Sequence, residues 1–334
     1  MPGETANIGE FARIVSEKVF SKFGWKISGT ENENFPCEKI EVHQRKSRSP
    51  THPCDIVFYY DDPYEEKRQY FLTDLKSYGR DSITKTSLRA ALRELGRSVD
   101  CANSSAEWRK KYVNQDVGDW QVHGLLFIFN HDNNFKHSFE TFFLDESPDD
   151  IALPKNSRLF VFGPERIHYL QNILADISKC RGDQRLPLEK SVFLYPHRIR
   201  RFSKEMNSET ARIELLLGPW QILPFDFEDT EGKHKTGVFI YYQGSGKDPA
   251  EFEYIFDFCF RNQLVKDGHT IEIRMLNPDS SVLQVLSQAK ENFEKNFYSS
   301  PDIAKRMMQF NVYSIDETEI RFSSEIVGME ARNG

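Results

Sequence analysis

Residues 53–78 read PCDIVFYYDDPYEEKRQYFLTDLKSY, and this stretch decides the fold. It holds two runs rich in β-branched and aromatic residues, DIVFYY (55–60) and RQYFLTDLKSY (68–78). A polar turn, DDPYEEK, separates them. Runs of this kind, bounded by turn residues, are typical of strands, and a short connection favours a hairpin.

The hairpin predicts a cluster of charged side chains. Alternate residues of a strand share a face, so Asp74 and Lys76 point to one side while Leu75 points into the core. An antiparallel strand that starts at Asp55 brings a second carboxylate to the same end of the sheet. The alternative is an ion pair on a solvated face, between Asp74 and Lys76 or across the strands.

Two carboxylates, a backbone carbonyl and waters suit a hard cation such as Mg²⁺. Such an ion binds a phosphate oxygen, lowers the pKa of a bound water and stabilises the charge of an in-line displacement, with Lys76 neutralising charge or positioning the water. The acid-x-Lys pattern also occurs at 65–67 and 231–233, but in polar turns. Only the copy at 74–76 lies inside an apolar strand, where an unpaired charge is costly.

The elements around the hairpin are predicted from periodicity and stop signals. Their order is helix, three strands, helix, strand, which is an α/β pattern. In chain order they are a helix over 8–24, strands over 39–44, 55–60 and 68–78, a helix from 82 to about 100, and a strand over 122–130.

Length predicts two domains, since 334 residues exceed the roughly 150 expected of one. A strand over 158–163 and a helix opening at Pro164 extend the first domain to 1–180. The polar segment 181–190 serves as a linker, and 190–334 form a second α/β or α+β domain for partner binding, oligomerisation or target recognition.

Composition excludes several classes of protein. With 39% apolar and 28% charged residues the chain is globular and not disordered. No apolar run approaches the roughly 18 residues of a membrane span, and the N-terminus lacks a signal peptide, so we expect a soluble cytoplasmic protein with no membrane partner. The five cysteines are odd in number, widely spaced and never in a C-x-x-C pair, which argues against disulfides or a zinc knuckle.

The net charge of −7 offers no global footprint for nucleic acid, so any polyanion must be met locally. Residues 76–111 contain nine basic and four acidic side chains. Within them Lys85, Arg89, Arg93 and Arg97 recur every four residues and form a stripe on one helix face. The stripe fits backbone contacts with DNA without base specificity, and a solvated helix side is the alternative.

The pattern resembles the PD-(D/E)XK nuclease superfamily, whose restriction-endonuclease-like core is an αβββαβ unit. The resemblance covers residues 8 to about 130. It implies that Asp55, Asp74 and Lys76 are catalytic, and that Asp55, Asp74 and the carbonyl of Leu75 bind the metal. The sequence departs from the motif where Cys54 separates Pro53 from Asp55.

Many members of the superfamily also place a glutamate of the first helix in the site. Gly9-Glu10 resembles the Gly-Glu opening of some of these nucleases, which makes Glu10 a catalytic candidate and Glu17 a weaker one. The helical wheel places both opposite the apolar face, where a solvated face also predicts glutamates.

The resemblance implies a Mg²⁺- or Mn²⁺-dependent endonuclease that hydrolyses DNA, acting as the effector of a restriction or anti-phage defence system. A second protein subunit or a homo-oligomer is the expected partner besides DNA. Two alternatives remain. One is a catalytically inactive, nuclease-like subunit that binds nucleic acid or a partner, and the other is a purely structural subunit.

Overall fold

A computed structural model of the chain describes residues 2–43, 50–62, 64–114, 117–135, 138–142, 151, 153–186, 193–194, 210–229, 231–297 and 301–318. The described chain divides into two compact units that meet between His168 and Tyr169. This boundary falls inside helix α4 (Pro164–Gly182). The sequence-based boundary at 181–190 lies later in the chain, and 187–190 are outside the described residues.

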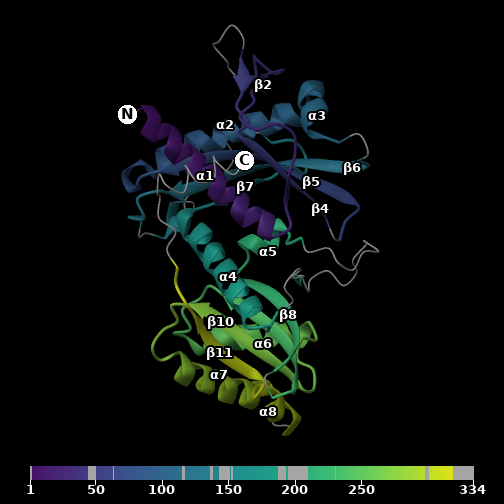
Figure 1. Cartoon of the computed structure of the whole chain (residues 1–334), viewed down its shortest axis with the longest axis vertical. Coiled ribbons are helices and arrows are strands. Elements are labelled where there is room, and N and C mark those ends of the chain that lie inside the picture. The colour runs from purple at the N-terminus through teal and green to yellow at the C-terminus, as the bar shows by residue number, and fades with distance from the viewer. Residues whose placement is uncertain are drawn as a thin grey trace. The chain divides into compact units, whose positions relative to one another are not determined.

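The N-terminal unit is built on a five-stranded sheet of order β1-β4-β5-β6-β7 (Figure 1). β4 runs antiparallel to β1 and β5, whereas β5, β6 and β7 are parallel. The predicted hairpin and the strand predicted over 122–130 are confirmed, and that strand runs parallel to β5. The strands are β1 (Lys26–Ile27), β4 (Ile56–Asp61), β5 (Lys67–Tyr78), β6 (Asp119–Asn130) and β7 (Leu159–Phe162).

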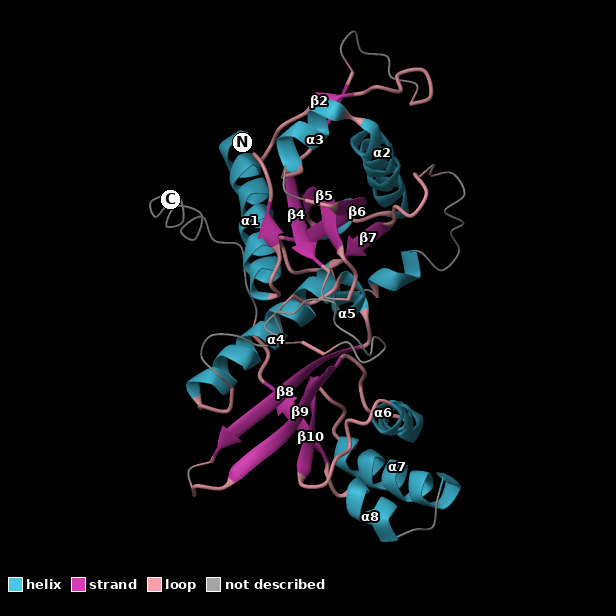
Figure 2. Cartoon of the chain, turned by 90° about the vertical axis from the view of Figure 1, so that its right-hand side faces the viewer, coloured by secondary structure: helices cyan, strands magenta, loops and turns pink. Residues whose placement is uncertain are grey.

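Helices cover both faces of this sheet, and Figure 2 shows α1 and α2 on opposite sides of it. The helical elements before α4 are α1 (Pro2–Lys22), η1 (Arg80–Ser82), α2 (Lys85–Ser104), α3 (Ala106–Tyr112) and η2 (Phe139–Phe142). On one face, Phe20 of α1 packs on Phe58 and Phe127. On the other, Leu95 of α2 shares a buried cluster with Leu72 of β5.

Local chemistry fixes where α2 begins and how closely it packs. The Thr84 side chain accepts a hydrogen bond from the Ser87 N–H at 3.1 Å, and Ser87 Oγ accepts from the Thr84 N–H at 3.0 Å, which is a capping box. Gly124 of β6 permits the close approach of the helix, because a Cβ there would meet Leu95 at 2.9 Å and Leu159 at 2.4 Å.

One predicted strand is wrong. Residues 39–43 form a turn, closed by the N–H of His43 donating to the carbonyl of Lys39 at 2.9 Å, and Gln44 lies outside the described residues. The apolar residues that suggested a strand, Ile40 and Val42, are 46% and 70% exposed. The first strand of the αβββαβ order is instead β1, which pairs with β4. Two further strands, β2 (Phe35–Pro36) and β3 (Thr51–His52), form a separate small sheet.

The C-terminal unit contains a four-stranded sheet of order β11-β10-β9-β8, in which only the β8–β9 pair is antiparallel. This confirms a second α/β domain. Its strands are β8 (Trp220–Glu228), β9 (His234–Tyr242), β10 (His269–Leu276) and β11 (Phe310–Ile315). Its helices beyond α4 are α5 (Ile213–Leu217), α6 (Pro249–Arg261), α7 (Val282–Phe297) and α8 (Pro301–Met307). Residues of α6 and α7 pack with the strands in one buried cluster.

None of the helices in the described part of the chain is both long and apolar enough to cross a bilayer.

Candidate active site

The hairpin gathers the three residues that the motif singles out. Asp55 immediately precedes β4, and Asp74 and Lys76 lie in the second half of β5. The register pairs Ile56 with Thr73, so one step further along the ladder sets Asp55 opposite Asp74. Since Lys76 is two residues beyond Asp74, it projects from the same face.

Hydrogen bonds hold the two carboxylates. The backbone N–H of Leu75 donates to Asp55 Oδ2 at 2.7 Å. Lys76 Nζ donates to Asp74 Oδ1 at 2.5 Å, with the two side chains 32% and 15% exposed. The ion pair that sequence reasoning kept as the alternative is therefore present, but a second carboxylate lies beside it. One ammonium serves two carboxylates at this point.

Burial and mutual repulsion shape the protonation of the cluster. Burial raises the pKa of Asp55, the Leu75 N–H partly offsets this, and the nearby Asp74 carboxylate raises the pKa again. Burial lowers the pKa of Lys76, but Asp74 and Asp55 outweigh it, and the net pKa is raised. Lys76 therefore remains protonated at neutral pH, while the carboxylate pair favours an added cation.

The donor set fits a hard divalent ion. Asp55 and Asp74 offer carboxylate oxygens, and Leu75, between Asp74 and Lys76, offers its backbone carbonyl; these are the ligand types that Mg²⁺ and Mn²⁺ prefer. Sequence reasoning did not single out Tyr78, which continues the same two-residue spacing. Burial raises the pKa of Tyr78, with Lys76 lowering it and Asp74 raising it.

Glu10 and Glu17 form ion pairs with a basic residue of their own helix. Both are held by Arg13 of α1, Glu10 with a 2.6 Å ion pair, and Glu31 joins the same guanidinium at 3.3 Å. Among the described residues, the carboxylate of Glu10 does not lie close enough to those of Asp55 and Asp74 for the three to bind one metal ion. The structure thus gives Glu10 an ion-pair partner, and its catalytic role stays a prediction.

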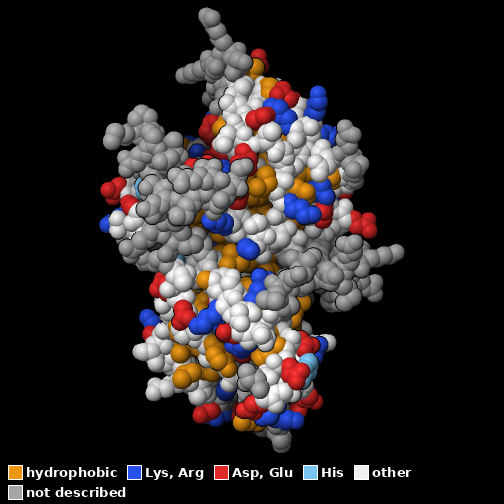
Figure 3. All heavy atoms as spheres, viewed as in Figure 1, with side chains coloured by type: hydrophobic (Ala, Val, Ile, Leu, Met, Phe, Trp, Pro, Cys, Tyr) orange, Lys and Arg blue, Asp and Glu red, His pale blue; other side chains and the backbone are white. Residues whose placement is uncertain are grey.

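The basic stripe lies on α2, the helix that follows the hairpin. Lys85, Arg89 and Arg93 are exposed, and the partly buried Arg97 forms an ion pair with Glu94 at 2.6 Å. The face of the molecule in Figure 3 mixes acidic and basic side chains and shows no single-sign field. A polyanion would therefore be recognised by a local feature such as this stripe.

Comparison with known proteins identifies the fold family. Residues 1–166 match the family model described as GAPS4 protein PD-(D/E)XK nuclease domain. No curated protein and no solved structure matches the chain. The matched region includes the hairpin, α2 and the acidic residues described above, and it confirms the resemblance drawn from the motif. The N-terminal part of this chain therefore belongs to the PD-(D/E)XK nuclease domains.

Proposed function

We propose that the chain is a Mg²⁺- or Mn²⁺-dependent endonuclease that hydrolyses DNA phosphodiester bonds. The observation that carries the proposal is the juxtaposition of the Asp55 and Asp74 carboxylates beside the Lys76 ammonium, in a chain whose N-terminal part is a nuclease domain. When bound, a divalent ion at this point supplies a polarised phosphate oxygen and a water of lowered pKa.

The residues of the chain take distinct parts in this reaction. The N–H of Leu75 fixes the orientation of the Asp55 carboxylate toward Asp74. Asp74 holds Lys76 in place, so that its ammonium is positioned before substrate arrives. Against the effect of burial, the Asp74 and Asp55 carboxylates raise the pKa of Lys76, so its ammonium is a cation that can neutralise charge developing on the phosphate or help to position the attacking water.

DNA would be bound through its backbone. The exposed side chains of Lys85, Arg89 and Arg93, with Arg97 at the end of the row, offer cations at helical spacing on α2. Contacts of this kind place the duplex without reading its sequence. The proposal therefore includes DNA affinity that falls steeply with salt.

The biological role that we propose rests on the family. GAPS4 proteins are associated with anti-phage defence, and we extend to this chain the role of a cytoplasmic defence or restriction effector. The predicted C-terminal domain (190–334) would supply partner binding, oligomerisation or target recognition. Large apolar side chains on the C-terminal unit support this, with Tyr254, Leu283 and Met308 more than 60% exposed.

The direct test is incubation of the purified full chain with supercoiled plasmid, with Mg²⁺ or with a chelator. We expect nicked or linear product only with the metal. Asp74→Ala and Lys76→Ala should each lower cleavage by at least about 100-fold, since the first removes a ligand of the metal and the second removes the cation that stabilises charge on the phosphate. Gel quantification of the first cleavage event gives the rates.

The matched control is Lys233→Ala. Lys233 belongs to another acid-x-Lys pair and contacts Glu231 at 2.8 Å, but both side chains are about 70% exposed in a turn. Cleavage should not change in this variant. Full activity in both Asp74→Ala and Lys76→Ala would refute the site. Unchanged DNA affinity with no calorimetric Mg²⁺ or Mn²⁺ binding would instead favour the inactive, nuclease-like binding subunit.

A further inference from the structure

A second cluster of potential ligands lies in the N-terminal unit, away from the carboxylates of the hairpin. It consists of Cys37, His43, His52 and Cys101, whose ligand atoms all lie within 4.8 Å of one another. All four residues are buried, with exposures of 4%, 5%, 0% and 0%. No other group of three or more such side chains approaches this closely among the residues that the structure describes.

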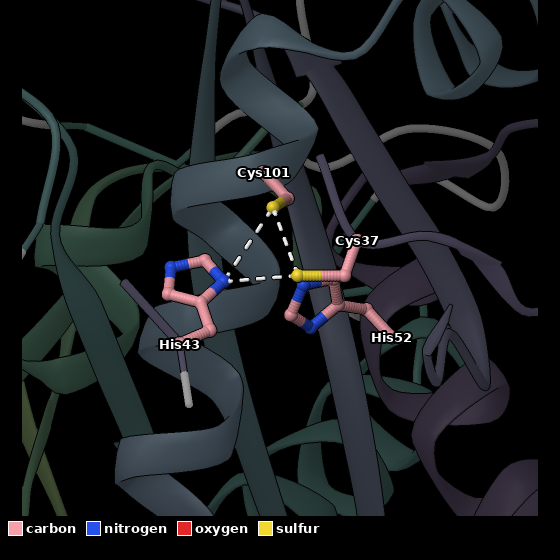
Figure 4. A group of neighbouring side chains, drawn as sticks. All are labelled: Cys37, His43, His52 and Cys101. Atoms are coloured by element: carbon pink, nitrogen blue, oxygen red, sulfur yellow. Dashed lines mark hydrogen bonds between the residues drawn. The ribbon is translucent and has the colours of Figure 1, made fainter. Parts of the chain in front are cut away.

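Three of the distances within the cluster match the edges of a tetrahedron, and the ligand atom of His52 lies within 4.8 Å of the other three. His43 Nδ1 lies 3.3 Å from Cys37 Sγ and 3.6 Å from Cys101 Sγ, and the two sulfurs are 3.9 Å apart (Figure 4). Tetrahedral zinc, with Zn–S near 2.3 Å and Zn–N near 2.0 Å, requires about 3.8 Å between two sulfurs and about 3.5 Å between sulfur and nitrogen. The sulfurs are too far apart for a disulfide, and both cysteines are free.

The outer partners of His43 leave the correct nitrogen for a metal. His43 Nε2 lies 3.2 Å from Asp100 Oδ2, and Asp100 is held in turn by Lys39 at 2.8 Å. A carboxylate accepts only, so Nε2 carries the proton and Nδ1 turns its lone pair toward the two sulfurs. A carboxylate behind a ligating histidine is the usual outer shell of a zinc site.

His52 is oriented by a similar argument. Its Nδ1 lies 3.3 Å from Ser98 Oγ, and that hydroxyl donates its own proton to the carbonyl of Glu94 at 3.0 Å. Ser98 Oγ therefore accepts from His52 Nδ1, which leaves Nε2 deprotonated. In Figure 4 the His52 ring lies beside the sulfur of Cys37. Each histidine thus has one unprotonated ring nitrogen that can serve as a metal ligand in the cluster.

We propose that Cys37, His43, His52 and Cys101 bind a structural Zn²⁺ ion. Two thiolates and two imidazoles are a typical donor set for structural zinc, and four protein ligands leave no open position for catalysis. This ion is distinct from the Mg²⁺ or Mn²⁺ of the proposed nuclease site, whose ligands are oxygens.

The zinc ion would join three segments that are separate in the sequence. Cys37 precedes the turn 39–43, and His43 is the last residue of that turn. His52 ends the two-residue strand β3, and Cys101 lies in the last turn of α2. A pair of strands this short is marginal on its own. The ion would therefore connect the small β2–β3 sheet to α2, the helix that carries the basic stripe.

The first measurement is the metal content of the full chain by elemental mass spectrometry, after purification in a reducing buffer and dialysis. We expect about one zinc per chain, and about none in Cys101→Ser. Cys54→Ser is the matched control, because Cys54 is also buried, at 2% exposure, in the same core cluster as Cys37 and Cys101. It should retain its zinc.

The second measurement uses the unaltered chain and does not depend on a variant that folds. Replacement of the metal by Co²⁺ should give the absorption of a tetrahedral ion together with thiolate-to-cobalt charge-transfer bands. Absence of zinc from the purified chain, together with failure of Co²⁺ to give these bands, would overturn the proposal. So would zinc retained in Cys101→Ser at the level of the unaltered chain.

Discussion

Each unit places charged side chains on one face of its sheet, but the charges balance in only one of them. In the C-terminal unit, Arg274 contacts both oxygens of Asp176 at 2.7 and 2.8 Å and Glu272 at 2.8 Å. Arg185 joins Glu272, and the Tyr241 hydroxyl donates to Asp176 at 2.8 Å. Two cations meet two carboxylates, and each carboxylate has at least two partners.

The hairpin of the N-terminal unit lacks this balance. In the part of the chain that the structure describes, Lys76 is the cation paired with Asp74 beside Asp55, and the pKa of Asp55 is raised by burial and by Asp74. The side chains are also less enclosed, with Lys76 32% exposed against 7% for Arg274.

The difference separates a structural network from a site. In a balanced, enclosed network the charges are already compensated, and another ion has no place there. Two carboxylates that share one ammonium near solvent carry excess negative charge, which favours binding of a divalent cation. Buried charge alone is thus a poor indicator of function, and the ratio of carboxylates to cations, with access to solvent, is a better one.

The largest expected effect is on the C-terminal network. Arg274→Met leaves Asp176 and Glu272 buried without their shared cation, so we expect a loss of about 3–5 kcal/mol in the free energy of unfolding. Urea unfolding followed by circular dichroism measures it. Lys233→Met, which removes one partner of an exposed pair, should change stability by less than about 1 kcal/mol. Equal effects of the two changes would mean that the enclosed Arg274 network contributes no more to stability than an exposed ion pair.

In the hairpin, removing a charge should increase stability instead of lowering it. In Asp55 the folded-state pKa lies above the unfolded one, so its ionisation destabilises the fold increasingly as pH rises through that range. Without metal, Asp55→Asn should therefore be more stable than the unaltered chain at neutral pH, with the advantage vanishing in acid below both pKa values. Thermal unfolding across pH tests the sign, and an Asp55→Asn variant that is less stable at neutral pH would contradict it.

Metal should reverse this order. At ten times its dissociation constant, Mg²⁺ should stabilise the unaltered chain by about 1.4 kcal/mol. Asp55→Asn should lose most of that gain, because it lacks one of the two carboxylate ligands, and Arg274→Met should keep it. The shift of the melting temperature with Mg²⁺ concentration gives the measurement. A gain of equal size in Asp55→Asn would place the ion elsewhere.

A smaller effect is expected from the stripe on α2. Removing Arg89 and Arg93 together should reduce the slope of log affinity against log salt by about 0.9 for each phosphate that the protein no longer neutralises. Fluorescence anisotropy with a short duplex measures the slope. Removing Lys233 and Lys235, which lie on the C-terminal unit, is the control. An unchanged slope after removal of both arginines would mean that the stripe is only a solvated helix side.

Much of the fold could be predicted because its strands are long and their patterns are strong. The run 55–60 is apolar over most of its length, the run 68–78 carries an apolar block at 70–72, and burial follows these patterns. The segment 39–44 fails because alternation alone does not distinguish a strand from a turn with exposed apolar residues. The strand that replaces it, β1, has two residues, which is too short to leave a pattern.

The candidate site divides in the same way. Asp55 and Asp74 could be brought together by reasoning, because a hairpin has a register and a register fixes which residues face each other. Cys37 and Cys101 are 64 residues apart and lie on unrelated elements. Their contact depends on how the small β2–β3 sheet packs against α2, and no local sequence motif predicts that packing.

The smallest expected effect concerns Glu10 and sets the limit of the charge argument. Arg13 pairs with Glu10, Glu17 and Glu31, so one cation is shared by three carboxylates here as well, and α1 covers the face of the sheet opposite to α2. If Glu10 leaves Arg13 to position a water when substrate is bound, Glu10→Gln should lower cleavage by about tenfold, or about 1.4 kcal/mol. Glu17→Gln, which alters the same guanidinium's other partner, should leave cleavage unchanged. Plasmid cleavage rates separate the cases: a loss as large as that of Asp74→Ala would make Glu10 a direct metal ligand, and no loss would make it only a partner of Arg13.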